Sequence, residues 1–220
     1  MDLEAPIRNK KPKVDRMRIA LQKPEAILRE LHNRSLYRFI QTFWNEYSND
    51  PFQGNWHIEV LCKELEEIAR NVAAGKHREY DLIANVPPGT SKTAVTSIFF
   101  PIWCWTQWHW MKFIVASYGE TLSLESAEFS RDLMRSDKFK RIYPELEIRQ
   151  DKDKKSNFKI VKKEFVRSRT VPRILQGGNR FSTSVGGTLT GFHGHILIVD
   201  DPLNPNQALS EKELANANHW

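Results

Sequence analysis

The chain has 220 residues and a hydrophobic fraction of 40%, enough for one domain with a core and a helical attachment. Its only cysteines, Cys62 and Cys104, lie in apolar helical contexts, which argues against a disulfide framework or a zinc site and is typical of a reducing, intracellular setting. The net charge of +6 indicates a polyanionic partner, and the most apolar run, residues 98–110, is too short to span a bilayer.

Residues 1–50 are expected to form a basic tail followed by a helical segment. Lysine and arginine recur in the first 18 residues, which we interpret as a solvated tail, with a DNA- or partner-binding arm as the alternative. Pro24 then opens a helical pattern of apolar residues that reaches Trp44. A second helix is predicted from Asn55 to the glycine at position 75.

A short apolar run at residues 80–86 predicts a core strand, and it ends in a Pro-Gly turn before Lys92 and Thr93. A strand, a turn and a helix in this order can hold a triphosphate, because backbone N–H groups of the turn and helix N-terminus point at phosphate oxygens. Lys92 would reach the β- and γ-phosphates, and the Thr93 hydroxyl would bind Mg²⁺. The candidate ATP-binding residues are Pro88, Gly89, Thr90, Ser91, Lys92 and Thr93.

This loop departs from the full phosphate-binding signature, which has glycine at both ends of the six-residue span before Lys-Thr. Val86 and Ser91 occupy those two positions. Taken alone, the loop is equally compatible with a plain turn that carries a surface lysine. Just upstream, Gln53 and His57 could hydrogen-bond an adenine edge, or could simply be a helix cap and a surface histidine.

Three elements are expected after the loop. The first is an apolar helix at residues 92–106, kinked at Pro101, whose tryptophans pack in the core. A buried strand at residues 112–117 follows, and then a helix at residues 121–136. Arg131, near the end of this helix, is either a surface cation or a sensor of the γ-phosphate.

The stretch from residue 149 to 173 is the most basic part of the chain, and its interleaved apolar residues predict hairpin strands with cationic outer faces. Such a face could be a solubilising surface or a contact for the DNA backbone. Glycines between residues 177 and 194 predict the turns of a further hairpin. Ser210 and Glu213 form a capping-box pattern that predicts a final helix.

The four apolar residues at 196–199 predict a strand buried on both faces, and Asp200 and Asp201 follow it. Ligands bind beyond the carboxyl ends of strands in open α/β sheets. Asp200 could hold Mg²⁺, directly or through water, and Asp201 could polarise an attacking water molecule. The same sequence is compatible with an ordinary strand-ending turn, so it is the pairing with the Lys-Thr loop that favours an NTPase.

Four blocks, in the same order, resemble the large subunit of the terminases of tailed bacteriophages, which are ATP-driven DNA-packaging motors. The first is VPPGTSKT at residues 86–93. The second comprises FPIW at 100–103, IVASY at 114–118, EFSR at 128–131 and IYPE at 142–145. The third is VGGTLTG at 185–191, and the fourth is IVDDP at 198–202, followed by ALS at 208–210 and Trp220. The resemblance covers residues 53–220, and its specificity comes from the ordered set.

This resemblance implies an α/β fold: a P-loop NTPase of the additional-strand type at residues 51–220, with a mainly parallel sheet between helices, after an N-terminal helical extension. It implies Lys92 and Thr93 at the phosphates and Mg²⁺, Asp200 at Mg²⁺, and Asp201 as the catalytic carboxylate. The family often has glutamate at this last position. Arg131 matches a Ser-Arg position of the family.

The resemblance further implies ATP and Mg²⁺ as cofactors and double-stranded DNA, a portal protein and a small terminase subunit as partners. It implies a homo-oligomeric ring when active, in the host cytoplasm and transiently at the procapsid portal, without a membrane. Large terminases add a C-terminal nuclease domain, to which nothing here corresponds, so we expect a truncated motor domain without nuclease activity.

Two other functions stay open. A helicase-like P-loop DNA translocase would share the loop and the carboxylates, but further helicase motifs are missing. A non-catalytic basic DNA-binding or assembly protein could retain a degenerate nucleotide loop for its fold, and Val86 and Ser91 are compatible with that alternative.

Overall fold

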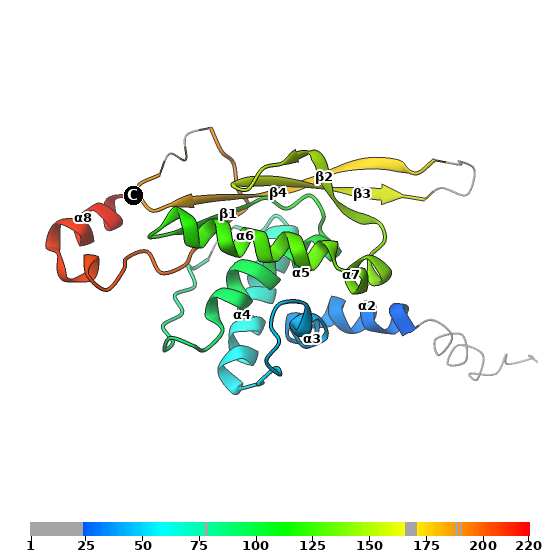
Figure 1. Cartoon of the computed structure of the whole chain (residues 1–220), viewed down its shortest axis with the longest axis horizontal. Coiled ribbons are helices and arrows are strands. Elements are labelled where there is room, and N and C mark those ends of the chain that lie inside the picture. The colour runs from blue at the N-terminus through cyan, green and yellow to red at the C-terminus, as the bar shows by residue number, and fades with distance from the viewer. Residues whose placement is uncertain (1–23, 78, 166–170, 188, 190) are drawn as a thin grey trace, which may run out of the picture.

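A computed structural model describes residues 24–77, 79–165, 171–187, 189 and 191–220, so the expected basic tail at residues 1–18 lies outside the described residues. The chain folds as an α/β structure (Figure 1). The α-helices are α2 (Pro24–Arg34), α3 (Leu36–Phe43), α4 (Trp56–Ala73), α5 (Phe100–Gln107), α6 (Glu120–Arg135), α7 (Asp137–Ile142) and α8 (Glu211–His219).

Five strands form one sheet in the order β2-β3-β4-β1-β5. They are β1 (Phe113–Ser117), β2 (Leu146–Asp153), β3 (Asn157–Glu164), β4 (Arg173–Ser184) and β5 (Ile196–Val199). In Figure 1, α5 and α6 lie along one side of this sheet and α8 lies beyond one end.

The sheet is mixed, with a parallel core, where the sequence predicted a mainly parallel one. Strand β1 is parallel to both β4 and β5, whereas β3 is antiparallel to β4 and to β2. The reason lies in the connections: parallel neighbours need a long crossover, and only short segments join β2 to β3 and β3 to β4.

Residues 80–86 form no strand of the sheet, which corrects the strand predicted there. Leu82 and Ala84 pack against the core, while Ile83 between them is 81% exposed. The alternation of an extended chain is therefore present, but a strand also needs a hydrogen-bonded neighbour, and this segment has none in the sheet. The prediction for β5 is also partly wrong, because Leu197 and Val199 are about half exposed rather than buried on both faces.

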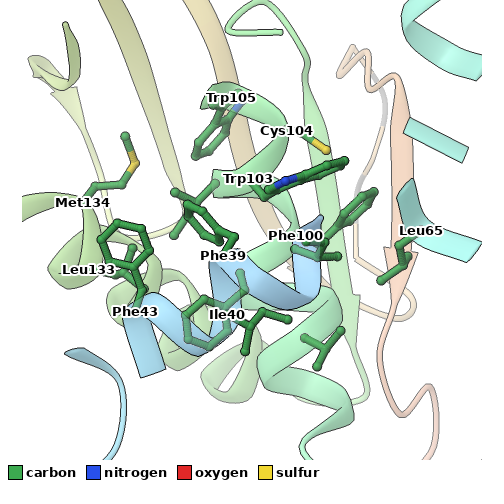
Figure 2. Close-up of a cluster of buried hydrophobic side chains, with 14 of the residues drawn as sticks. Phe39, Ile40, Phe43, Leu65, Phe100, Trp103, Cys104, Trp105, Leu133 and Met134 are labelled. Carbon is green, nitrogen blue, oxygen red and sulfur yellow. The ribbon is translucent and has the colours of Figure 1, made fainter. Parts of the chain in front are cut away.

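The core is aromatic and continuous from α3 to the sheet. Phe39, Trp103 and Trp105 are fully or almost fully buried in one cluster that extends to Phe158 on β3, and Figure 2 shows part of it. This confirms that Trp103 and Trp105, the tryptophans of the helix predicted after the loop, pack in the core, whereas Trp110 is exposed. Cys62 and Cys104 are free and buried.

The helix predicted at residues 92–106 is divided. A π-helical segment, η2 (Ala94–Phe99), precedes α5, and Pro101 lies in the first turn of α5. Proline has no N–H and its ring collides with the carbonyl four residues earlier, so the hydrogen-bond register changes here. The N-terminal helix also divides, because Ser35 caps a new helix with its side chain accepting from Arg38 N.

The glycines at 177 and 178 lie inside β4 and do not form the expected turn. A Cβ atom at Gly178 would stand 1.6 Å from the carbonyl oxygen of Met111, and Gly178 N donates to His109 O. This position therefore needs glycine for a close backbone approach. In the described part of the chain, no helix is long and apolar enough to cross a membrane.

Candidate functional site

The candidate site forms where the loop before Lys92 meets the end of β5. Lys92 Nζ contacts a carboxylate oxygen of Asp201, 109 residues away in the sequence, and lies 3.6 Å from Oδ1 of Asp200. The chain after β5 is held along β1, because Asp200 N donates to Ala116 O and Tyr118 N donates to Asp201 O. The structure thus brings together the lysine and both carboxylates that the sequence singled out.

Strained backbone is concentrated at this meeting point. Ser91 and Asp201 are the two non-glycine residues with positive φ in the described ranges, at 64° and 47°, and Gly89 has a φ of 78°. Left-handed geometry is costly for residues with a Cβ, and such residues cluster at functional sites. Ser91 also stands where the phosphate-binding signature has glycine, so the loop adopts a glycine-like conformation without the glycine.

Electrostatics keep Lys92 charged. Burial by itself would lower the pKa of Lys92, but the hydrogen bond to Asp201 and the charges of Asp200 and Asp201 outweigh it and raise the pKa above its ordinary value. The side chain of Asp201 is mostly exposed, whereas Asp200 is buried and accepts from Ser97 Oγ at 3.4 Å. The two adjacent carboxylates therefore occupy different environments.

A cavity of about 280 Å³ opens beside these residues. Its walls come from η2, the end of β1, the first turns of α6 and the two carboxylates. Its polar lining is Tyr47, Thr93, Ser97, Ser117, Ser123, Glu125, Ser126, Asp200 and Asp201. Ligand pockets usually exceed about 300 Å³, so this cavity suits phosphate groups and water better than a whole nucleotide.

The residues present fit a magnesium ion. Thr93 and Asp200 line the same cavity and offer the hard oxygen ligands that Mg²⁺ prefers. Within the described ranges, no group of three or more His, Cys, Asp and Glu side chains could hold a metal ion by itself. That is compatible with Mg²⁺ at a nucleotide site, where one or two protein oxygens are completed by phosphates and water.

The two adenine candidates lie near the loop in different ways. His57 is on the first turn of α4, and its Nε2 is 3.3 Å from the carbonyl oxygen of Thr90. Gln53 is exposed just before that helix. His57 therefore contacts the loop backbone, and an adenine contact by either residue stays a prediction.

Arg131 is buried on α6, and its Nη1 forms an ion pair with Oδ1 of Asp153 at 3.2 Å. Arg135 pairs with the same carboxylate. The lining of the cavity does not include Arg131. The structure thus places this arginine between α6 and β2, and its role as a phosphate sensor stays a prediction.

The basic hairpin is partly neutralised. Lys163 pairs with Glu147 across β2 and β3, and Arg149 pairs with Asp151. Lys154, Lys155 and Lys159, at and beside the turn between these strands, are exposed. The turn is therefore the cationic part of the hairpin that a polyanion can reach.

Two further residues, which sequence reasoning missed, adjoin the site. Arg180 on β4 is fully buried, and Ser97 on η2 contacts Asp200. Burial, followed by the charge of Arg131, lowers the pKa of Arg180 to about 9, which leaves it charged at neutral pH. The alternation of side chains along a strand places Arg180 on an inner face, but that signal needs β4 to be recognised as a strand first.

No protein-family model matches the chain, and a search of curated proteins found no significant match.

Proposed function

We propose that this chain is the Mg²⁺-dependent ATPase motor domain of a viral terminase large subunit, a P-loop ATPase that drives double-stranded DNA into a procapsid. One observation carries the proposal: Lys92 meets Asp200 and Asp201 beside a cavity. In the described ranges, the only non-glycine residues with positive φ lie at this point, namely Asp201 itself and Ser91, which precedes Lys92. If the loop only carried a surface lysine and β5 only ended in an ordinary turn, the two segments would have no reason to converge.

The residues divide the chemistry of γ-phosphate hydrolysis among them. Lys92 would bind the β- and γ-phosphate oxygens and stabilise the charge that develops on them. A triphosphate would compete with the carboxylates for this lysine. Asp201 would then be free to orient a water molecule for in-line attack and to accept its proton, and its exposure gives water access.

Thr93 and Asp200 would hold Mg²⁺, because both line the cavity and supply oxygen atoms. When bound, the ion supplies neutralisation of phosphate charge. Thr93, which directly precedes the π-helical η2, and Ser97 within η2 line the same cavity. Short π-helical segments of this kind are frequent at functional sites.

DNA would be bound through its phosphates, without sequence preference. The exposed lysines at and beside the β2–β3 turn, Lys154, Lys155 and Lys159, suit such a contact. Assembly into a ring, and docking to a portal protein and a small subunit in the host cytoplasm, belong to the same proposal and follow from the resemblance alone.

The test is ATP hydrolysis by purified wild type and Asp201→Asn at varied Mg²⁺, with and without double-stranded DNA. We expect turnover that requires Mg²⁺ and falls by at least about 100-fold in the variant, because the amide cannot accept the proton. Glu211→Gln, which removes an exposed carboxylate on α8, is the matched control and should keep wild-type turnover. Equal turnover in wild type and Asp201→Asn would refute the assignment.

A non-catalytic basic DNA-binding or assembly protein is the second candidate, and one observation favours it. Residues 80–86, which should lead into the phosphate loop as a core strand, are not part of the sheet. This candidate predicts salt-sensitive DNA binding with neither ATP binding nor turnover in the wild type. DNA-stimulated turnover would exclude it.

A further inference from the structure

Arg180 is a buried cation with no carboxylate partner in the described part of the chain. Its Nη1 contacts Ser182 Oγ and lies 3.4 Å from the carbonyl oxygen of Ser123. Its Nη2 contacts Ser126 Oγ at 2.7 Å and lies 3.4 Å from the carbonyl oxygen of Ser97. One guanidinium thus joins β4 to α6 and to η2 through neutral oxygen atoms.

Pro101 explains why the carbonyl oxygen of Ser97 can accept a hydrogen bond from Arg180. Pro101 stands four residues after Ser97 and has no N–H, so it cannot donate the usual helical hydrogen bond to the Ser97 carbonyl. A buried carbonyl oxygen is stabilised by a hydrogen bond from another donor. The Nη2 of Arg180 lies within reach of that oxygen, and the guanidinium therefore holds the backbone of η2 at this residue.

Ser97 is also the link to the candidate metal ligand. Its Oγ donates to Oδ2 of Asp200 at 3.4 Å, while Lys92 Nζ lies on the side of Oδ1. Ser97, Ser123 and Ser126, three of the four residues that Arg180 contacts, line the cavity together with Asp200. A continuous chain of contacts therefore runs from Arg180 through Ser97 to the carboxylate.

We propose that Arg180 is a positioning residue for Asp200. It fixes the Ser97 backbone in η2, and Ser97 Oγ then orients the Asp200 carboxylate toward Mg²⁺. This inference rests on the proposed function, because it assigns a partner to the ligand that would hold the ion. Partners of this kind commonly change metal affinity by about 10–100-fold when they are removed.

A packing role for Arg180 makes a different prediction from a positioning role. If Arg180 only joined three elements, its replacement would lower stability and leave the dependence of nucleotide binding on Mg²⁺ unchanged. If it acts through Ser97, replacing either residue weakens the response to Mg²⁺, and replacing both weakens it no further.

The experiment measures binding of a fluorescent, non-hydrolysable ATP analogue to the full chain as Mg²⁺ is varied, with melting temperatures recorded in parallel. The variants are Ser97→Ala, Arg180→Lys and the double variant. Ser130→Ala is the matched control, because Ser130 is equally buried on α6 and its Oγ donates to the carbonyl oxygens of Ser126 and Ile98 rather than to Asp200. If Arg180→Lys does not fold, Ser126→Ala replaces it in the single and double variants, since it removes one Arg180 contact only.

We expect Ser97→Ala to raise the half-saturating Mg²⁺ concentration by about 10-fold, Arg180→Lys to raise it in the same direction, and the double variant to match the larger single effect. Ser130→Ala should leave it within about twofold of wild type. Unchanged Mg²⁺ dependence in the single variants, or additive effects in the double, would overturn the inference while leaving the proposed function intact. A wild type that binds no analogue at any Mg²⁺ concentration would overturn both.

Discussion

The burial of His32 among the N-terminal helices can be tested through the dependence of the free energy of unfolding on pH. His32 is fully buried on α2, where Nδ1 is 2.8 Å from the Tyr143 hydroxyl and Nε2 is 2.9 Å from Thr42 Oγ1. Burial, followed by the charge of Lys138, lowers the pKa of His32 from 6.5 to about 4. The folded protein therefore keeps this ring neutral at pH values at which the unfolded chain protonates it.

The sign and size of the effect follow from linkage. Between pH 6.5 and pH 4 the unfolded state binds more protons at this position, so the free energy of unfolding falls as the pH falls. At about 1.4 kcal/mol per unit, and allowing for partial protonation of the folded state near pH 4, His32 accounts for a loss of about 3 kcal/mol between pH 7.5 and pH 4.

The assay is urea denaturation of wild type and His32→Gln at four pH values from 7.5 to 4. Glutamine can keep a hydrogen bond but does not titrate, so the variant should be less stable at pH 7.5 and lose about 3 kcal/mol less than wild type on acidification. His193→Gln replaces an exposed histidine and should follow the wild-type curve. If wild type and His32→Gln lose stability in parallel, the account of a neutral buried His32 is wrong.

Two further predictions concern backbone geometry, and urea denaturation measures both. Ser91→Gly should change the free energy of unfolding by less than about 1 kcal/mol. Ser91→Val puts a β-branched residue at positive φ and should lower the free energy of unfolding by about 2 kcal/mol. Equal free energies of unfolding for the two variants would contradict a strained backbone at Ser91. Gly178→Ala should lose at least about 3 kcal/mol because its Cβ meets backbone, whereas Gly119→Ala has open space and should lose less than about 1 kcal/mol.

The parts of the fold that the sequence predicts are those governed by local signals. Helix α4 has an apolar face, a cap at Asn55 and a glycine with positive φ at position 75. Strand β1 is a short apolar run, and it is buried at every position as predicted. The cap of α8 also follows its pattern, since Ser210 Oγ accepts from Glu213 N. In each case, the residues that specify the element lie within it or next to it.

The errors arise where an element depends on a distant partner. Residues 80–86 have the composition and alternation of a strand, but only a hydrogen-bonded neighbour would make them one. The apolar residues of β5 predicted burial on both faces, yet what covers a face is decided by the rest of the chain, and Leu197 remains exposed. The candidate site residues could be predicted because they depend on local signals: Lys92, Asp200 and Asp201 each follow a recognisable local pattern.

Arg180 shows why the support of a site is harder to predict than the site itself. Its position is intelligible only after three separate facts are combined: the missing N–H of Pro101, the contact of Arg180 with the Ser97 carbonyl oxygen and the packing of β4 against α6. None of these is visible at residue 180. A buried arginine held by neutral oxygen atoms forgoes the attraction of a carboxylate, and its charge remains costly to bury. Stability alone is therefore a poor explanation for its presence, and its connection through Ser97 to Asp200 is a better one.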